Sequence, residues 1–569
     1  MHAKIESIKA HKNFFALVFF LPIFYFGHLR FISRTGIAAE QYWIIQNRHS
    51  GILTGFLYGD ESRPFLSLLF HAIYLVFGEN YTAVILTNSL LTLVIAFLTF
   101  NICFKITQSF GLSVIAGILI LSHGGEQSTH LFSMLVLKQV VISLLLLLLI
   151  YLKIKDGNEL RYIFFIAFFS IIALFTYEAS LLVLVIIIGL ILNKFLVSKR
   201  YNTGASFFLL TLPIFFFLLI NLSRYFISDE VSYQSKKFRN PTLNGVFESA
   251  QEYIKGILFP NTWETYYEGY FKECIPEVSS IIGSSPLILA TVYLFLISGL
   301  IYLIHRSRSS RTNSAGLKEP ILFLLLVASY TPYFFVSDGT GNWRTQFIAL
   351  PFFTIFVIRI ILRISYIRKD IIRVISSIFL VLFFTFWIMH GLYALQTQQL
   401  YFAKYWSDHQ KYFKQITEVA PGLADNTEIL LSGIPQGSSY CEKLERDPFE
   451  DPYWLSAGFH VYYPNLYHPS TSRQIASYSN QKFSDLLIKP NGEKSIKIVD
   501  DKNAYDFDLE NLVIMEWTGN KFSIISSSDF SLKAVTNAKY YSPSSLVKMK
   551  SKLDDQARSN LGIMPITTP

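Results

Sequence analysis

The sequence has few cysteines and few charged residues. Only Cys103, Cys274 and Cys441 occur in 569 residues, and Cys103 lies inside an apolar run. At most one disulfide, between Cys274 and Cys441, can form, which excludes a disulfide framework. Charged residues make up 16% of the chain and hydrophobic residues 52%, and the mean hydropathy is +0.38. So apolar a composition is atypical of a soluble protein and indicates a polytopic membrane protein.

The motifs of several enzyme classes are also missing. The sequence has no Gly-rich Walker loop, no GxGxxG after a strand and no GxSxG elbow. ATP-driven transport and serine-hydrolase chemistry are therefore unsupported, and no nucleotide is expected. The first apolar run, which ends near Phe31, lacks a small-residue cleavage site, so it predicts an uncleaved first span rather than a signal peptide.

Apolar runs of spanning length recur through the first 395 residues and predict about eleven membrane spans. They lie near residues 14–33, 81–104, 110–122, 132–152, 161–176, 179–197, 205–227, 285–304, 319–336, 345–363 and 371–394. Basic residues fall on alternate loops between these runs, and this bias predicts a cytoplasmic N-terminus in a cell (inner) membrane. It also accounts for the net charge of +9, so no nucleic acid partner is expected.

A polar loop from Glu40 to Gly78 follows the first span. It contains the carboxylates Glu40, Asp60 and Glu61 and then an apolar run from Pro64 to Phe77. That run is shorter than the about 20 residues that cross a bilayer. A span here would also turn every later basic loop outward. We therefore expect juxtamembrane helices in this first outer loop.

The order of residues in this loop resembles a known pattern. An acid (Glu40) is followed by Glu61-Ser62-Arg63-Pro64 and then by Leu75-Val76-Phe77-Gly78. The pattern is similar to that of GT-C glycosyltransferases, nearest to the lipid A aminoarabinose transferases and the protein O-mannosyltransferases. The resemblance implies a GT-C-like membrane domain over residues 1–395, a polyprenyl-phosphate sugar donor and a carboxylate that acts as the catalytic base.

The sequence departs from this family pattern in two places. It has Glu rather than Asp at the first position, and one Pro where the aminoarabinose transferases have two. The base assignment therefore stays open between Glu40, which is favoured, Glu61 and Asp60. Each acid has a simpler interpretation, since Glu40 can cap an interfacial helix and Asp60 and Glu61 can precede a helix that starts at Pro64.

Arg344 opens a predicted span at the outer face, where a guanidinium can bind a lipid-linked phosphate through two hydrogen bonds. Arg63 is the second candidate for this role. The alternative for Arg344 is an interfacial arginine whose side chain reaches outward to water.

Tyr177 and Glu178 occupy a short corner between two predicted spans. An acid so near the edge of the bilayer is costly unless it is hydrated or paired, so this pair is predicted to bind the sugar or the acceptor. The alternative is a solvated turn.

His123, Glu126 and His130 are spaced by three and four residues in the link between two predicted spans. Imidazole and carboxylate groups suit Zn²⁺ or Mn²⁺, so a divalent cation is one candidate cofactor. The alternative is that these are ordinary polar loop residues.

Residues 396–569 differ in composition from the rest. They have mixed charge and turn residues, and short apolar runs such as EILLSGIP and LENLVIMEW indicate strands. We expect an extracytoplasmic α/β or mostly β domain.

Taken together, the sequence predicts transfer of a sugar to a glycan, lipid or protein acceptor at the outer face of the membrane, with membrane lipids as neighbours. The alternatives are a transporter or flippase of lipid-linked sugars, a polymerase or ligase of such sugars, and an inactive scaffold. A transporter would carry charged residues inside its spans, and Lys138 is the main such residue.

Overall fold

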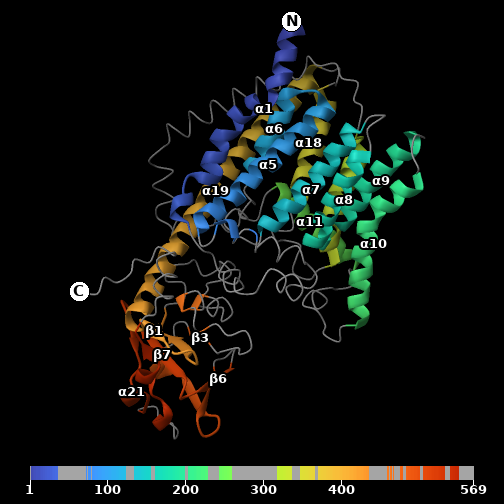
Figure 1. Ribbon diagram of the computed structural model, residues 1–569. Coiled ribbons are helices and arrows are strands. Elements are labelled where there is room, and N and C mark those ends of the chain that lie inside the picture. The colour runs from blue at the N-terminus through green and yellow to red at the C-terminus, as the bar shows by residue number, and fades with distance from the viewer. Residues whose placement is uncertain are drawn as a thin grey trace. The chain divides into compact units, whose positions relative to one another are not determined.

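Figure 1 shows the computed structural model of the chain. It describes residues 2–35, 72, 75–77, 80–123, 134–154, 160–198, 203–227, 242–258, 317–335, 347–365, 370–434, 458–459, 462–463, 466, 475–478, 482–499, 504–531 and 538–549. Contacts divide the chain into two compact units. The helical unit comprises Met1–Ser33, Ile52–Ala72 and Ala83–Leu400, and the C-terminal unit comprises Arg34–Gly51, Ile73–Thr82 and Tyr401–Pro569. Each is described by itself.

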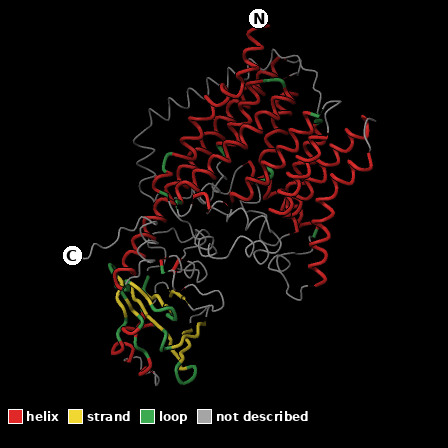
Figure 2. Tube along the Cα trace, in the orientation of Figure 1, coloured by secondary structure: helices red, strands yellow, loops and turns green. Residues whose placement is uncertain are grey.

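Helices, most of them apolar, make up the described part of the helical unit (Figure 2). They are α1 (His2–Phe24), α5 (Tyr81–Thr107), α6 (Phe110–Leu121), α7 (Met134–Lys153), α8 (Leu160–Thr176), α9 (Leu181–Ser198), α10 (Thr203–Ile227), α11 (Leu243–Leu258), α16 (Glu319–Tyr330), α18 (Leu350–Ser365) and α19 (Asp370–Val419). From Tyr401 onward, α19 belongs to the C-terminal unit. Short helical turns follow α1 (η1, Tyr25–Leu29, and η2, Ile32–Arg34), α8 (η5, Glu178–Ser180) and α16 (η7, Thr331–Phe335).

Every predicted span except 285–304 overlaps one of these helices, and 285–304 lies outside the described residues. In the described part of the chain, four helical segments are long and apolar enough to cross a membrane, namely His11–Arg34, Thr82–Thr107, Leu135–Lys153 and Val374–Leu400. Shorter apolar helices accompany them. The membrane-protein character and the helical majority are thus confirmed, whereas the count of about eleven spans stays a prediction. The predicted juxtamembrane run Pro64–Phe77 lies mostly outside the described residues, and residues 75–77 are helical.

The centre of the helical unit is α6. It packs against α1 and α18, and its residues from Gly111 to Leu121 are all buried. A helix that is apolar on every side belongs in a protein interior. With 12 residues it is about 18 Å long, well short of the about 30 Å hydrocarbon core of a bilayer. The absence of a side chain at Gly117 lets α1 approach closely, because a Cβ there would collide with the ring of Phe20.

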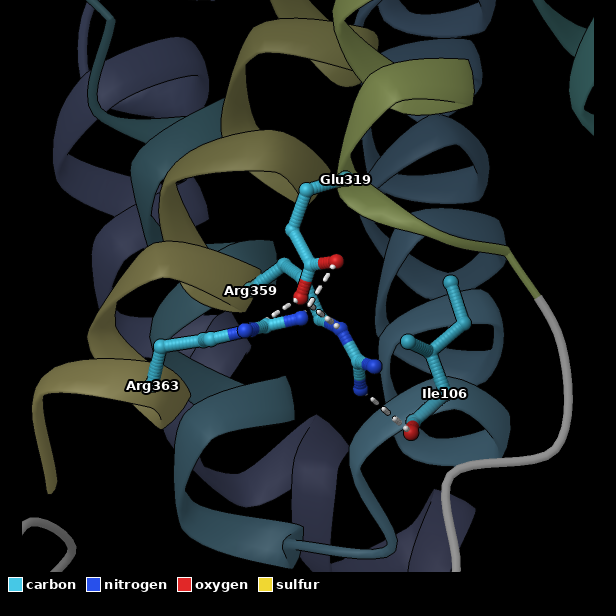
Figure 3. A network of polar contacts seen from close by, with 4 residues as sticks. All are labelled: Ile106, Glu319, Arg359 and Arg363. Atoms are coloured by element: carbon cyan, nitrogen blue, oxygen red, sulfur yellow. Dashed lines mark hydrogen bonds and ion pairs between the residues drawn. The ribbon is translucent and has the colours of Figure 1, made fainter. Parts of the chain in front are cut away.

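Cationic side chains gather at one end of the helical unit, which we call the basic end. Figure 3 shows the Glu319 carboxylate of α16 held between the guanidinium groups of Arg359 and Arg363 of α18. The Nε atoms of Arg359 and Arg363 lie 3.1 Å and 2.7 Å from Glu319 Oε1. Arg359 Nη1 also donates to the Ile106 carbonyl oxygen at 3.5 Å. The network therefore joins α16 and α18 to the end of α5.

The described part of the C-terminal unit combines the end of α19 with three small sheets. A four-stranded sheet has the order β3 (Ile475–Tyr478), β2 (Glu428–Ser432), β7 (Leu512–Trp517) and β8 (Phe522–Ile524). In it β2 pairs in parallel with β3 and β7, and β8 is antiparallel. An antiparallel meander follows the order β4 (Leu487–Pro490), β5 (Ser495–Val499) and β6 (Ala504–Asp508), and β1 (Gly422–Leu423) pairs with β9 (Val547–Lys548).

The two strands predicted in EILLSGIP and LENLVIMEW are confirmed as β2 and β7, which are direct neighbours. Their residues are almost all buried, as expected of parallel strands covered on both faces. Buried aromatic rings lie beside this sheet in the described part of the unit. Phe413 of α19 stacks on Tyr462 with ring centres 4.1 Å apart, and fully buried His409 contacts Phe413.

Gly117→Ala is expected to destabilise the helical unit, because the added Cβ collides with the buried Phe20 ring. We expect a net loss of about 1 kcal/mol, because overpacking costs about 1–3 kcal/mol and the helix gains about 0.5–1 kcal/mol from alanine. Gly189→Ala in α9 is the matched control, because nothing lies within 4 Å of its added Cβ. Thermal melting in detergent measures both. Equal melting temperatures for the two variants would contradict the close α1–α6 packing.

The C-terminal unit is expected to lose stability below pH 6.5 through His409. Burial lowers the pKa of His409 to about 3, from 6.5. Above pH 6.5 the imidazole ring is mostly neutral in both the folded and the unfolded chain, so it contributes little to the pH dependence of stability. As the pH falls from 6.5, the unfolded chain binds a proton that the folded unit excludes. The free energy of unfolding then drops by about 1.4 kcal/mol per pH unit, about 2 kcal/mol between pH 6.5 and pH 5.

Hydrogen–deuterium exchange of peptides from β2 and β7, corrected for the intrinsic pH effect on exchange, measures this loss. His409→Gln is the control variant, because glutamine does not titrate, and its stability should change less over the same pH interval. The same pH dependence in both proteins would show that another group is responsible.

Candidate functional site

The predicted site residues divide into those that the structure describes and those that it does not. His123 and Tyr177 are described, as is the backbone of Glu178 in η5. The others lie outside the described residues: Glu40, Asp60, Glu61, Arg63, Glu126, His130 and Arg344. The geometry below therefore concerns the surroundings of His123 and Tyr177.

Lys138, in the first turns of α7, is the most deeply buried cation of this region. Its side chain is 0% exposed. Nζ donates to the Asn88 carbonyl oxygen at 3.1 Å and to Thr92 Oγ1 at 2.7 Å, both on α5, and lies 5.8 Å from the centre of the Phe347 ring. Both acceptors belong to α5, so the ammonium group links the first turns of α7 to that helix. Taking a charge out of water costs several kcal/mol, so its presence here calls for a reason.

His28 lies near Lys138 at the same end of the helical unit. It belongs to the π-helical turn η1, and its fully buried ring is 3.0 Å, through Nε2, from the Leu121 carbonyl oxygen at the end of α6. It is close enough to Lys138 for the two to interact electrostatically. A π-helical turn at the end of an α-helix widens the backbone locally, and such turns are frequent at functional sites.

His123 is buried just beyond α6. Its Nε2 is 3.3 Å from the Ile257 carbonyl oxygen of α11, and its ring centre is 5.6 Å from that of Trp387. His123 also interacts electrostatically with His390 of α19. Burial lowers the pKa of His123 to about 4, so the imidazole is neutral near pH 7.

Four tyrosines form a second group beside these residues. Tyr333 donates its hydroxyl hydrogen to the Tyr177 hydroxyl at 3.2 Å. The Tyr330 ring lies 5.6 Å from that of Tyr333 and stacks on Tyr253 of α11 with centres 3.7 Å apart. Desolvation raises the pKa of Tyr253 well above 10, so it remains a neutral hydrogen-bonding group.

Helix α11 joins the two groups. Its buried face presents Ser249, Tyr253 and Ile257, spaced four residues apart, so that one helix face contacts both the tyrosines and His123. The other face exposes Phe247 and Ile254, which suits an interfacial position. We call the whole region, from Lys138 and His28 to Tyr177, the polar end. It lies about 22 Å along α7 from Lys153, which belongs to the basic end.

The predicted residues are thus brought together only in part. Tyr177 and His123 share the polar end, with α11 as their common neighbour. Among the described residues no three His, Cys, Asp or Glu side chains form a metal-binding group. Two of the three predicted ligands lie outside those residues, so the divalent-cation site stays a prediction. His123 Nε2 already faces a backbone carbonyl, so binding a metal through that atom would require this contact to break.

Two residues of the polar end were not among the predicted site residues. Lys138 and His28 are ionisable and lie within the candidate spans Leu135–Lys153 and His11–Arg34. An ionisable residue inside a span is by itself a pointer to function, and this signal was present in the sequence. The side chains of the polar end indicate which ligands it can bind. It can attract an anionic group through Lys138 and bind hydroxyl groups through neutral histidine and tyrosine side chains.

Comparisons with known proteins do not assign this chain to a family. No protein-family model matches the sequence, and no curated protein matches it. Among solved structures, the crystal structure of ArnT from Cupriavidus metallidurans bound to undecaprenyl phosphate aligns with 13% sequence identity and a TM-score of 0.38. The alignment covers 83% of this chain and 90% of that chain.

Lys138→Met is expected to leave the melting temperature unchanged or to raise it. The substitution keeps the volume of the side chain and removes the cost of burying a charge, and replacing buried charges by apolar residues is often neutral or stabilising. Thr92→Val, which removes only the hydroxyl acceptor, is expected to be destabilising by about 1–3 kcal/mol because one acceptor of the buried ammonium is lost. Thermal melting in detergent compares them. A Lys138→Met protein much less stable than Thr92→Val would assign Lys138 a structural role.

Proposed function

We propose that this chain is a GT-C-type glycosyltransferase that moves a sugar from a polyprenyl-phosphate donor to a hydroxyl-bearing acceptor at the outer face of the membrane. The observation that carries the proposal is the fully buried ammonium of Lys138 at the polar end, which is hydrogen-bonded to α5. A fixed positive charge at one end of an apolar helix bundle suits a substrate that joins a phosphate to a long apolar chain.

The chemistry requires a base and a stabilised leaving group. The acceptor hydroxyl oxygen would bond to the anomeric carbon of the sugar, while the bond from that carbon to the phosphate oxygen breaks and leaves its electrons on the phosphate. The hydroxyl proton would pass to a carboxylate, with Glu40 favoured over Glu61 and Asp60. Arg344, helped by Arg63, would bind the departing polyprenyl phosphate.

The position of Lys138 supports this division of roles. At an effective permittivity of about 20, a unit charge about 8 Å from a phosphate stabilises it by roughly 2 kcal/mol, so direct contact is not required. Phe347, whose ring faces Lys138 Nζ, follows Arg344 by three residues in the sequence. Three residues of extended chain span at most about 11 Å, so Arg344 and Lys138 are suited to act on one phosphate group.

The polar end also offers groups for the sugar. Tyr177 and Tyr333 place two hydroxyls 3.2 Å apart, and aromatic rings with hydroxyl groups suit a pyranose. We assign Tyr177 and Glu178 to the sugar or the acceptor. If a divalent cation takes part, His123, Glu126 and His130 are the residues proposed to hold it, and it would supply further charge neutralisation at the phosphate.

The test follows release of polyprenyl phosphate by purified protein from a membrane lipid extract that contains polyprenyl-phosphate sugars. We expect Glu40→Gln to lower release about 10²–10⁴-fold and Arg344→Ala about 10²–10³-fold, because a base and a charge-stabilising donor contribute about these factors. Glu61→Gln identifies the base if Glu40→Gln is active. Lys138→Met should lower the release of polyprenyl phosphate about 10-fold or more and should not lower the melting temperature below that of the wild type.

Glu248→Gln is the matched control, because Glu248 is an exposed carboxylate on α11 and the substitution makes the same chemical change. It should release polyprenyl phosphate at the wild-type rate. Wild-type rates in all the carboxylate and arginine variants would overturn the assignment of these residues. An absence of release by the wild type, with every acceptor class supplied, would overturn the proposed reaction.

A transporter of lipid-linked sugars is the second candidate. The observation in its favour is that Lys138 and His28 are charged or ionisable groups buried within candidate spans. Reconstituted vesicles separate the two functions. A transporter moves a fluorescent polyprenyl-phosphate sugar across the bilayer unchanged and is insensitive to Glu40→Gln, whereas the transferase cleaves it.

A further inference from the structure

Four lysines from four helices converge at the basic end, far from the polar end. They are Lys12 of α1, Lys105 of α5, Lys153 of α7 and Lys194 of α9. Lys12 is close enough to interact electrostatically with Lys105 and Lys153, and Lys194 with Lys105. The fold thus places like charges together although the four residues are distant in the sequence.

Two of these lysines are held by neutral groups of the neighbouring helices. Lys12 Nζ lies 4.4 Å from the centre of the Phe104 ring. Lys194 Nζ donates to the Tyr151 carbonyl oxygen at 2.7 Å and lies 4.2 Å from the centre of the Tyr151 ring. These contacts orient both ammonium groups toward the residues beside Lys105 and Lys153, and they leave the positive charge of each lysine in place.

Helix dipoles do not offset this charge. The helices α5, α7, α9 and α18 end here, and each C-terminus carries about half a negative elementary charge. The helices α6, α8, α10, α16 and α19 start at the same end, and each N-terminus carries about half a positive charge. The net dipole contribution is therefore about half a positive charge, which has the same sign as the lysines.

The neighbouring ion network does not offset it either. Glu319, the carboxylate of Figure 3, already pairs with both Arg359 and Arg363. That group of three residues keeps one net positive charge, so it adds to the positive potential of the basic end instead of neutralising it.

The four lysines lie near the ends of apolar helices. Lys12 lies at the start of a candidate span, Lys105 and Lys153 lie at the ends of two others, and Lys194 lies in the last turns of α9. Lys12, Lys105 and Lys194 are half-buried and Lys153 is exposed. Lysines near the ends of membrane helices typically place their aliphatic stems along apolar surface and their ammonium groups at the membrane interface. Basic pockets between membrane helices are suited to lipid headgroups that carry phosphate.

We propose that Lys12, Lys105, Lys153 and Lys194 form a binding site for the phosphate-bearing headgroup of an anionic membrane lipid. The headgroup phosphate would accept hydrogen bonds from several ammonium groups and relieve their mutual repulsion. The acyl chains would lie along the apolar surfaces of the same helices. This site is separate from the proposed glycosyl-transfer site and does not depend on it.

Delipidated full-length protein, titrated with phosphatidylglycerol in a phosphatidylcholine background and observed by native mass spectrometry, tests the proposal. Lys105→Gln/Lys153→Gln should bind phosphatidylglycerol roughly 25-fold more weakly than wild type, since each lysine near a lipid surface contributes about fivefold. The matched control is Lys489→Gln/Lys497→Gln. It removes the same charge from a directly opposed lysine pair of β4 and β5, and its affinity should stay at the wild-type value.

Thermal melting separates lipid binding from a structural role. In phosphatidylcholine alone, Lys105→Gln/Lys153→Gln should melt at or above the wild-type temperature, because repulsion is reduced. Phosphatidylglycerol should raise the melting temperature of the wild type and of the charge-preserving Lys105→Arg/Lys153→Arg variant, and not that of the glutamine variant. Equal phosphatidylglycerol affinity in the wild type and the glutamine variant would overturn the proposal. An equal rise in melting temperature with inorganic phosphate would assign the site to a soluble anion and overturn it as a lipid site.

Discussion

Every buried polar group in an apolar helix bundle must find its partner within the protein, because hydrocarbon offers none. Many hydroxyls in the described helices meet this requirement locally, by donating to the carbonyl oxygen four residues earlier, as Thr107, Ser113 and Ser122 do. Other buried polar groups find their hydrogen-bond partners on a different helix or turn. Gln399 of α19 accepts from the Phe31 N–H and donates to the Gly27 carbonyl oxygen at 2.6 Å.

The same requirement explains why the helical unit has two unlike ends. At the basic end the cations are half-exposed or paired, as in the Glu319 network, so their charge is shared with water or a carboxylate. At the polar end Lys138 is fully buried, and it donates hydrogen bonds to two groups of α5. A surface cation of the first kind costs little, whereas a buried one is costly. The two ends are therefore suited to different partners.

Much of the fold was predictable from hydropathy and strand composition. The apolar runs overlap the described helices because a span must be long and apolar whatever its neighbours are. The strands β2 and β7 were predictable because β-branched and aliphatic runs bounded by turns favour sheets. Their parallel pairing was not, since strand neighbours depend on the path of the intervening chain. The candidate site was predictable only in outline, because Tyr177 and His123 were chosen for their residue types and not for their contacts.

The sequence by itself determined that this is a membrane protein with a C-terminal strand-containing region, because hydrophobicity and its period act through each segment separately. Only the tertiary structure decided which polar residues meet. Lys138 and Asn88 are 50 residues apart and Tyr177 and Tyr333 are 156 apart, and neither pair has a local signature. The convergence of Lys12, Lys105, Lys153 and Lys194 likewise follows from the packing of four helices. Packing is a property of surfaces brought together by folding, so no single stretch of sequence encodes it.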